Sequence, residues 1–288
     1  EGRMMTARTG KSTLIYAVLV LFGLFFLSPL YVMFVASFKT LAEVRQSSIF
    51  SLPQVWTIEP WIKAWSGACS GLDCQGIRPF FIATFEIAIP AVFFAIFLGA
   101  LNGYVMTQWR SKFADILFGL LLIGSFVPLQ LFLIPLAVTL RELDIYGTTA
   151  GLVLIHTVYG IPLTTMLFRN FYISLPSELF KAAVIDGAGF FKIFFSVIVP
   201  MSPAIMIVAI ILVFSGIYND FLFALTFGDT SKRPIMAAVQ NLVATTYGVK
   251  EHNTNIAAVF ISALPTLLLF LFAGKFFVRG LTHGAVKG

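Results

Sequence analysis

The chain has 288 residues, of which 59% are hydrophobic and 11% carry a charge, and its net charge at pH 7 is +6. Soluble domains carry about 25% charged residues, and a chain of this size cannot hide so much apolar surface in one core. The composition excludes a soluble enzyme, a disordered protein and a disulfide-stabilised scaffold as descriptions of the whole chain. It predicts an all-α polytopic membrane protein.

Uncharged stretches longer than about 20 residues, the length that crosses hydrocarbon as a helix, divide the chain. They predict six transmembrane helices, near residues 14–38, 79–106, 114–140, 146–171, 203–227 and 256–278. The apolar runs are continuous, whereas a membrane strand barrel alternates in polarity. The first run is too long for the apolar region of a signal peptide. We therefore expect a tail over residues 1–12, followed by a transmembrane domain over residues 13–288.

The basic residues predict which way the chain crosses the membrane. Six spans place both termini on one side, and the tails and loops of that side hold 11 of the 19 lysines and arginines. Basic residues concentrate in short cytoplasmic loops, so both termini are expected in the cytoplasm. The membrane also explains the positive net charge. Because no block of five basic residues occurs, no nucleic-acid partner is expected.

The longest loop on the outer side, residues 39–78, contains the two cysteines of the chain, Cys69 and Cys74. A disulfide between them would close a small ring in an oxidising compartment. Two free thiols are the alternative. The three histidines are too scattered along the sequence to suggest a metal site.

The N-terminal tail imitates a nucleotide site without forming one. Gly10-Lys11-Ser12-Thr13 matches the end of a phosphate-binding loop, but the glycine required five residues before Gly10 is Met5. Lys11 is therefore interpreted as an anchor at the membrane interface. The sequence also offers no nucleophile–base set, carboxylate dyad or dinucleotide-binding loop. We expect a non-enzymatic chain without a cofactor of its own, driven by a partner or an ion gradient.

Residues 172–203, between the fourth and fifth predicted spans, carry the most informative pattern. Pro176 suits the first turn of a helix, and Glu178 is favourably placed near the helix N-terminus. Gly187 permits a sharp bend. The first arm carries a short amphipathic surface, made by Leu179, Phe180, Ala182, Ala183 and Ile185.

A second short helix is expected over residues 189–199, ended by Pro200 and Pro203. The two arms together predict an exposed, L-shaped helical elbow. Such an apolar elbow either docks into another protein or rests on lipid headgroups.

The elbow closely resembles the "EAA" loop of bacterial ABC importer permeases. The residues that carry the resemblance are Pro176, Glu178, Ala182, Ala183, Asp186, Gly187 and Ala188, followed by Pro200. Further similarities are Ser37-Phe38-Lys39, the residues Pro128, Gln130, Pro135 and Pro162, and Tyr218-Asn219-Asp220-Phe221, which is similar to a "W-N-D" segment. Residues 280–288 are similar to the C-terminal signature of the maltose-type branch, whose members transport carbohydrates.

The resemblance implies that the elbow is a coupling helix seated in a cleft of an ATPase subunit. The implied coupling residues are Pro176, Glu178, Phe180, Lys181, Ala182, Ala183, Asp186 and Gly187. ATP and Mg would then be bound by the partner ATPase subunits. The other implied partners are a second homologous permease, a periplasmic sugar-binding protein and membrane lipid, in the bacterial inner membrane.

Two residues depart from the family pattern. The family usually has Glu at the position of Lys181, so the charge at the expected ATPase contact is reversed. The family has Trp at the position of Tyr218, so a ring is kept but an indole N–H becomes a phenol O–H.

Polar residues inside predicted spans usually face a cavity or a partner. Asn219 and Asp220 lie deep in the fifth predicted span, and Gln130 lies in the third. With Tyr218 they are the candidates for a translocation path. Hydrogen bonding between helices is the alternative role, and Glu86 lies close enough to the outer interface to be wetted.

Two readings of the function remain. The first is the permease of an ATP-driven sugar importer, with a hexose such as glucose or mannose as the expected substrate. The second is an ion-coupled secondary transporter, which needs internal repeats and midplane carboxylates. Asp220 is the only candidate carboxylate, and no clear repeat is visible.

Overall fold

The computed structural model describes residues 2–69, 74–108, 111–229, 233–244 and 250–285, with side chains described from residue 13 to residue 274. Within these ranges the regular structure is helical and contains no strand. Arg110, Lys232 and residues 286–288, which entered the charge count or the C-terminal signature, lie outside the described residues. The chain forms two compact units, Glu1–Arg78 with Asn241–Ile261 and Pro79–Gln240 with Ser262–Gly288.

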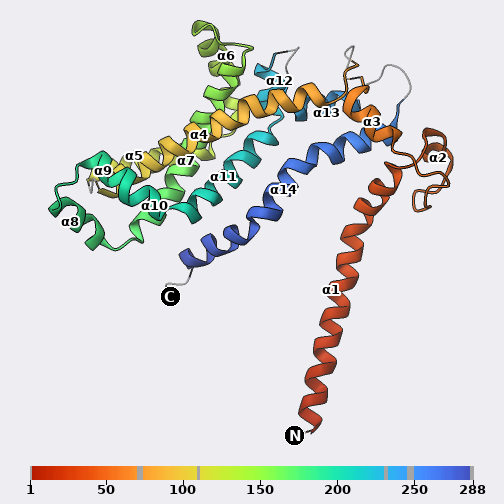
Figure 1. Cartoon of the computed structure of the whole chain (residues 1–288), viewed down its shortest axis with the longest axis horizontal. Helices are drawn as coiled ribbons and strands as arrows, with labels where there is room; N and C mark the ends of the chain where they lie inside the picture. Colours follow the sequence, from red (N-terminus) through yellow and green to blue (C-terminus); the bar gives the residue numbers. More distant parts are fainter. Residues whose placement is uncertain (1, 70–73, 109–110, 230–232, 245–249, 286–288) are drawn as a thin grey trace. The chain divides into compact units, whose positions relative to one another are not determined.

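The helices follow the chain in the order shown in Figure 1. They are α1 (Gly2–Ala36), α2 (Leu41–Gln46), α3 (Glu59–Ser66), α4 (Arg78–Gln108), α5 (Lys112–Phe126), the 3₁₀ turn η1 (Leu129–Phe132), α6 (Leu133–Glu142), α7 (Thr149–Ile173), α8 (Ser177–Ile185), α9 (Phe190–Ile193), the π-helical turn η2 (Phe194–Ile198), α10 (Val199–Met201), α11 (Pro203–Tyr218), α12 (Leu222–Phe227), α13 (Ile235–Ala244) and α14 (His252–Ala285).

Four described helices are long and apolar enough to cross a membrane: Thr13–Ala36, Arg78–Gln108, Thr149–Ile173 and His252–Gly274. Two bent pairs also qualify, Lys112–Phe126 with Leu129–Glu142 and Phe190–Met201 with Pro203–Tyr218. The described chain therefore has up to six spans, if each bent pair counts as one. This agrees with the all-α membrane fold predicted from the uncharged stretches.

The third predicted span is not one straight helix. Its two halves, α5 and α6 with η1, meet at an angle of 98°. Pro128 causes the break, because it lacks an N–H and disfavours helical backbone at the residue before it. Val127 accordingly has an extended backbone, with φ −70° and ψ 130°. The expectation of a continuous helix over residues 114–140 was wrong at this point.

The fifth predicted span is also interrupted. Helix α11 ends at Tyr218, and α12 begins at Leu222. The carboxylate of Asp220 accepts hydrogen bonds from the backbone N–H groups of Phe223 (3.3 Å) and Ala224 (2.9 Å). These N–H groups have no partner within a new helix, so Asp220 stabilises the start of α12 rather than lying inside a continuous helix.

Small residues bring α4 and α7 into direct contact in the second unit. A Cβ added at Gly99 would collide with Thr164, and one at Gly160 would lie 2.7 Å from the Cβ of Ala95. Thr164 Oγ1 donates a hydrogen bond to the carbonyl of Ala95 on α4 (2.9 Å). Small side chains and interhelical hydrogen bonds are the common means of helix association in membranes. The α4–α7 pair is thus a close-packed body, and α5 and α11 pack against α7.

In the first unit, a buried lysine organises the segment after α1. Lys39 is 2% exposed, and its Nζ donates hydrogen bonds to Ser47 Oγ (3.0 Å), the Ser48 carbonyl (3.2 Å) and Ser51 Oγ (2.9 Å). The side chain of Asn253, at the start of α14, donates to the Lys39 carbonyl (3.0 Å). A buried ammonium is costly unless its donors are paired, so these bonds fix the turn between α1 and α2.

Candidate functional site

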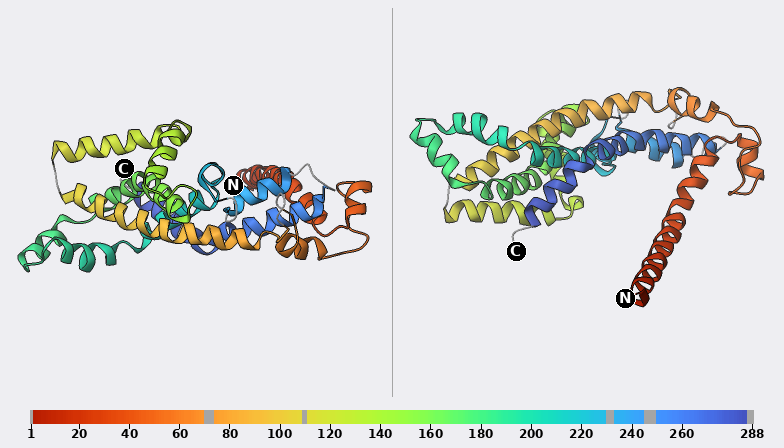
Figure 2. Two further views of the ribbon diagram at one scale, coloured as in Figure 1. Left: turned by 90° about the horizontal axis from the view of Figure 1, so that it is seen from above. Right: turned by 60° about the horizontal axis from the view of Figure 1, so that its bottom comes forward.

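The predicted elbow is present as α8, α9, η2 and α10, and it protrudes at one end of the second unit in the views of Figures 1 and 2. Pro176 is the residue immediately before α8, which begins at Ser177. Glu178 lies in the first turn, as expected, and is exposed. Its pKa lies below the ordinary value because its own backbone N–H, and then Ser177 Oγ at 3.2 Å, hydrogen-bond the carboxylate. Glu178 is therefore ionised at neutral pH, where the N-terminus of α8 favours it.

The bend of the elbow depends on the backbone of Gly187. Its φ is +73°, in the left-handed region that side chains disfavour. The bend is closed by hydrogen bonds from the Gly187 N–H to the Val184 carbonyl and from the Ala188 N–H to the Ala183 carbonyl, each 3.0 Å. A Cβ at Gly187 would meet nothing within 4 Å. The position consequently requires glycine for its conformation, not for lack of space.

Some side chains of the first arm, helix α8, pack against the protein core, and others are exposed. Phe180 and Ala183 pack against the core of the second unit. Leu179, Val184 and Ile185 are 38%, 62% and 83% exposed. We call these three residues the elbow apolar face. The predicted apolar surface is thus split, since Phe180 points inward and Val184, which the prediction omitted, is exposed.

The remaining predicted coupling residues lie around this face. Lys181, Ala182, Asp186 and Gly187 are exposed. Lys181 lies close enough to Glu178 to contribute to the lowered pKa of that carboxyl. The structure therefore presents both charges together on the first arm.

The second arm differs from the predicted single helix ending at Pro200. It begins as α9, becomes π-helical over Phe194–Ile198, and includes Pro200 inside α10. Pro200 lies in the first turn of α10, where its missing N–H is tolerated. The direction changes instead at Ser202, by 81° between Phe190–Met201 and Pro203–Tyr218. Ser202 Oγ donates to the Ile198 carbonyl (2.6 Å).

A second cluster of polar side chains lies between α7, α11 and α12. His156 Nε2 on α7 is 3.8 Å from Asp220 Oδ2, and both side chains are largely buried. They line a hollow of about 190 Å³, together with Tyr159 and Phe223. The ring centroid of Phe223 lies 5.1 Å from the ring centroid of Tyr159 and 5.7 Å from that of His156. A carboxylate, an imidazole and aromatic rings are thus assembled in one hollow.

Three of the predicted path residues lie elsewhere. Tyr218 is fully buried, and its hydroxyl donates to the Ser262 carbonyl on α14 (2.8 Å). Asn219 is exposed, and its Nδ2 donates to the Ser215 carbonyl (2.9 Å). Gln130 is exposed on η1, whereas its neighbour Leu129 lines the hollow. Tyr218 therefore joins α11 to α14, and only Asp220 of the predicted set lines the hollow.

Residues 91–282 match the family described as binding-protein-dependent transport system inner membrane component. The chain belongs to this family. The probable ABC transporter permease protein YurM of Bacillus subtilis is 31% identical, over 96% of this chain and 89% of that protein. The resemblance seen in the elbow residues is thereby confirmed.

Relatives with named substrates match over almost their full lengths. The melibiose/raffinose/stachyose import permease protein MelC of Bacillus subtilis is 30% identical, over 99% of this chain and all of that protein. The glucose import system permease protein GlcU of Saccharolobus solfataricus is 26% identical, over 94% and 93%.

The fold of this family member also matches a solved structure. A chain from the crystal structure of a bacterial ABC transporter involved in the import of the acidic polysaccharide alginate superposes with a TM-score of 0.77. The match covers 92% of this chain and 96% of that chain, at 16% sequence identity. The helical fold is therefore that of an ABC transporter chain.

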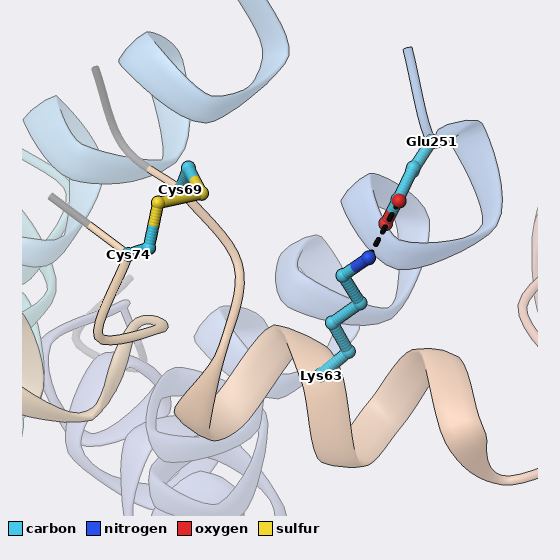
Figure 3. The surroundings of a disulfide bond; sticks show 4 residues. All are labelled: Lys63, Cys69, Cys74 and Glu251. Carbon is cyan, nitrogen blue, oxygen red and sulfur yellow. Dashed lines mark hydrogen bonds and ion pairs between the residues drawn. A yellow bond between two sulfur atoms is a disulfide. The ribbon is translucent and has the colours of Figure 1, made fainter. Parts of the chain in front are cut away.

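The segment between α3 and α4 of this family member contains the predicted cysteine pair. The structure joins Cys69 to Cys74 by a disulfide bond in the segment that follows α3 (Figure 3). On α3 itself, Lys63 Nζ forms an ion pair with Glu251 Oε1 (2.6 Å). The oxidation state of the two cysteines in the native membrane remains a prediction.

His156 and Tyr159 line the hollow but are not among the path residues predicted from the sequence. They are three residues apart and lie on one face of α7. That spacing is the signal that the sequence offered. The partner, Asp220, lies 64 positions after His156, and only the packing of α7 against α11 and α12 brings them together.

Proposed function

We propose that this chain is the transmembrane permease subunit of an ATP-driven sugar importer in the bacterial inner membrane, with both termini in the cytoplasm. The observation that carries the proposal is the exposed elbow with its glycine-dependent bend, in a chain of the binding-protein-dependent transport family. Its elbow apolar face exposes two side chains by more than 60%. An exposed, rigidly bent apolar surface of this kind is typical of a docking site.

The partner proposed for this surface is an ATPase subunit, which would bind ATP and Mg. The elbow would sit in a cleft of that subunit and move when the ATPase subunits close on ATP. Packed elements switch between discrete arrangements, so such a motion would reach the membrane helices. A second homologous permease and a periplasmic sugar-binding protein complete the proposed assembly.

The proposed sugar pathway passes the hollow that contains His156 and Asp220. Asp220 and His156 offer polar groups to sugar hydroxyls, and the rings of Tyr159 and Phe223 offer the faces on which a sugar ring packs. Polar side chains at membrane depth usually face a pathway or a partner. Asn219 and Gln130, which are exposed in the isolated chain, are proposed to face the pathway next to the second permease.

The proposed substrate is a hexose such as glucose or mannose. The named relatives import glucose and melibiose, raffinose or stachyose, which supports sugars as the substrate class. The test measures ATP-dependent uptake of glucose, mannose, maltose, xylose and glycerol 3-phosphate by the complete transporter in proteoliposomes. Uptake of glucose or mannose in preference to the other three supports the proposal. Preference for maltose, xylose or glycerol 3-phosphate contradicts it.

A further inference from the structure

Tyr104 on α4 lies where the elbow meets the membrane helices. It is one turn before the end of α4 and is 2% exposed. Its ring centroid lies 6.5 Å from that of Phe180, 4.7 Å from that of Phe190 and 5.6 Å from that of Phe194. A single side chain of α4 is thus surrounded by three phenylalanines of the elbow.

The three phenylalanines come from both arms. Phe180 is on α8, before the bend at Gly187, whereas Phe190 and Phe194 are on α9 and η2, after it. The elbow therefore cannot shift along α4, and the angle between its arms cannot open, without displacing the Tyr104 ring. The hydroxyl donates to the Phe190 carbonyl at 3.5 Å, which is longer than a strong hydrogen bond. Ring packing, not the hydroxyl, carries most of this contact.

Next to Tyr104, α4 is fixed to α7. A Cβ at Gly103 would lie 2.9 Å from the Cβ of Phe168 and 2.8 Å from the backbone N of Arg169. The same direct contact continues along α4 at Gly99, which faces Thr164. Close-packed interiors transmit displacement because they have few voids to absorb it. Any movement of the Tyr104 ring is therefore passed to the α4–α7 pair.

We propose that Tyr104 is the positioning residue that links movement of the elbow to movement of α4 and α7. This inference rests on the proposed function, because the elbow moves only if an ATPase subunit drives it. It adds a specific link: ring packing at Tyr104 couples both arms of the elbow to the membrane helices. Without the ring, the elbow still docks on the ATPase subunit, but its movement is not passed on.

The test compares Tyr104→Phe, Tyr104→Leu and Tyr104→Ala in the complete transporter, in lipid nanodiscs and proteoliposomes. Phe97→Ala is the matched control, because Phe97 lies on the same helix and its ring contacts Phe194 at 6.4 Å. Three quantities are measured. They are the amount of ATPase subunit that co-purifies, ATP hydrolysis with and without sugar-loaded binding protein, and sugar taken up per ATP hydrolysed. The sugar is the one with the highest uptake in the panel above.

Tyr104→Phe and Phe97→Ala are expected to match the wild type in all three quantities. Tyr104→Leu and Tyr104→Ala are expected to retain the ATPase subunit, while stimulation by the binding protein and uptake per ATP fall about tenfold. Tyr104→Phe keeps the ring and removes only the hydroxyl, so wild-type coupling in this variant shows that ring packing carries the link.

Wild-type stimulation and uptake in an assembled Tyr104→Ala transporter would overturn the inference. So would loss of the ATPase subunit from both Tyr104→Leu and Tyr104→Ala, because the ring would then support the fold rather than transmit motion. If the wild-type chain itself binds no ATPase subunit, the proposed function fails instead, and the two failures are distinguishable.

Discussion

Replacing Gly187 tests whether the bend of the elbow is needed for coupling. The residue has φ +73°, and the bend is closed by two backbone hydrogen bonds of 3.0 Å. Gly187→Val places a β-branched side chain in the left-handed region, where such residues are outliers. A Cβ there has open space around it, so the effect of the substitution comes from the backbone preference and not from a collision.

The size of the effect follows from that preference. Left-handed backbone costs a residue with a side chain roughly 1–2 kcal/mol relative to right-handed backbone. That cost corresponds to roughly a 5- to 30-fold shift between the bent elbow and other conformations. Asparagine tolerates the left-handed region better than other side chains do. Gly187→Asn is therefore the matched control, and Gly187→Ala should fall between the two.

The assay separates insertion from coupling. The amount of each variant in the membrane is measured first, followed by co-purification of the ATPase subunit and ATP hydrolysis stimulated by the binding protein. Gly187→Val should reach the membrane in wild-type amount and lose ATPase association or stimulated hydrolysis, whereas Gly187→Asn should retain both. Normal sugar uptake by Gly187→Val would refute the assignment of the elbow as the coupling element.

Three further predictions concern other parts of the chain. Cys69 and Cys74 should be bonded in protein taken directly from membranes, and two alkylated thiols in non-reducing mass spectrometry would contradict the bond. Lys181→Glu should weaken assembly or coupling and be rescued by a reversed charge on the ATPase subunit. An exposed ion pair between Lys181 and an acidic residue of the ATPase subunit contributes only about 0–1 kcal/mol. Equal uptake by mutant and parent at low and moderate salt would mean that the Lys181 charge is solvated and has no partner. Asp220→Ala removes the acceptor for two backbone N–H groups. It should lower the free energy of unfolding in detergent by roughly 0.5–2 kcal/mol and so lower the melting temperature. An unchanged melting temperature would contradict the capping role.

The sequence was sufficient to predict the features that depend on local chemistry. Continuous apolar stretches indicated the membrane spans because hydrocarbon requires about 20 such residues per helix. Gly187 indicated the bend because its conformational freedom is a property of the residue itself. The structure shows that bend at the expected residue.

Breaks within spans were harder to predict, although their causes are local. Pro128 ends α5 because it disfavours helical backbone at Val127, but a proline within an apolar stretch does not by itself show whether a span bends or stops. The sequence shows Asp220 as a polar residue within a predicted span, whereas its role at the start of α12 depends on the end of α11 at Tyr218. Uniform apolar composition gives no sign of where a helix stops, so the boundaries had to come from single residues.

The contacts that build the two sites depend on tertiary packing. His156 meets Asp220 only because α7 packs against α11 and α12, and Tyr104 meets the elbow only because α8 and α9 fold back onto α4. Neither pairing has a local sequence signal. Phe180 shows the same limit, since an amphipathic pattern does not say which of several apolar residues faces the protein.

The source of energy is the central claim, and co-purification followed by reconstitution tests it most directly. The tagged chain is purified in mild detergent with its partners and placed in liposomes, and sugar uptake is measured with ATP or with an ion gradient alone. The account predicts that an ATPase subunit accompanies the chain, and that uptake requires both ATP and the binding protein. Uptake by the chain without an ATPase subunit, driven by an ion gradient in the absence of ATP, would contradict it.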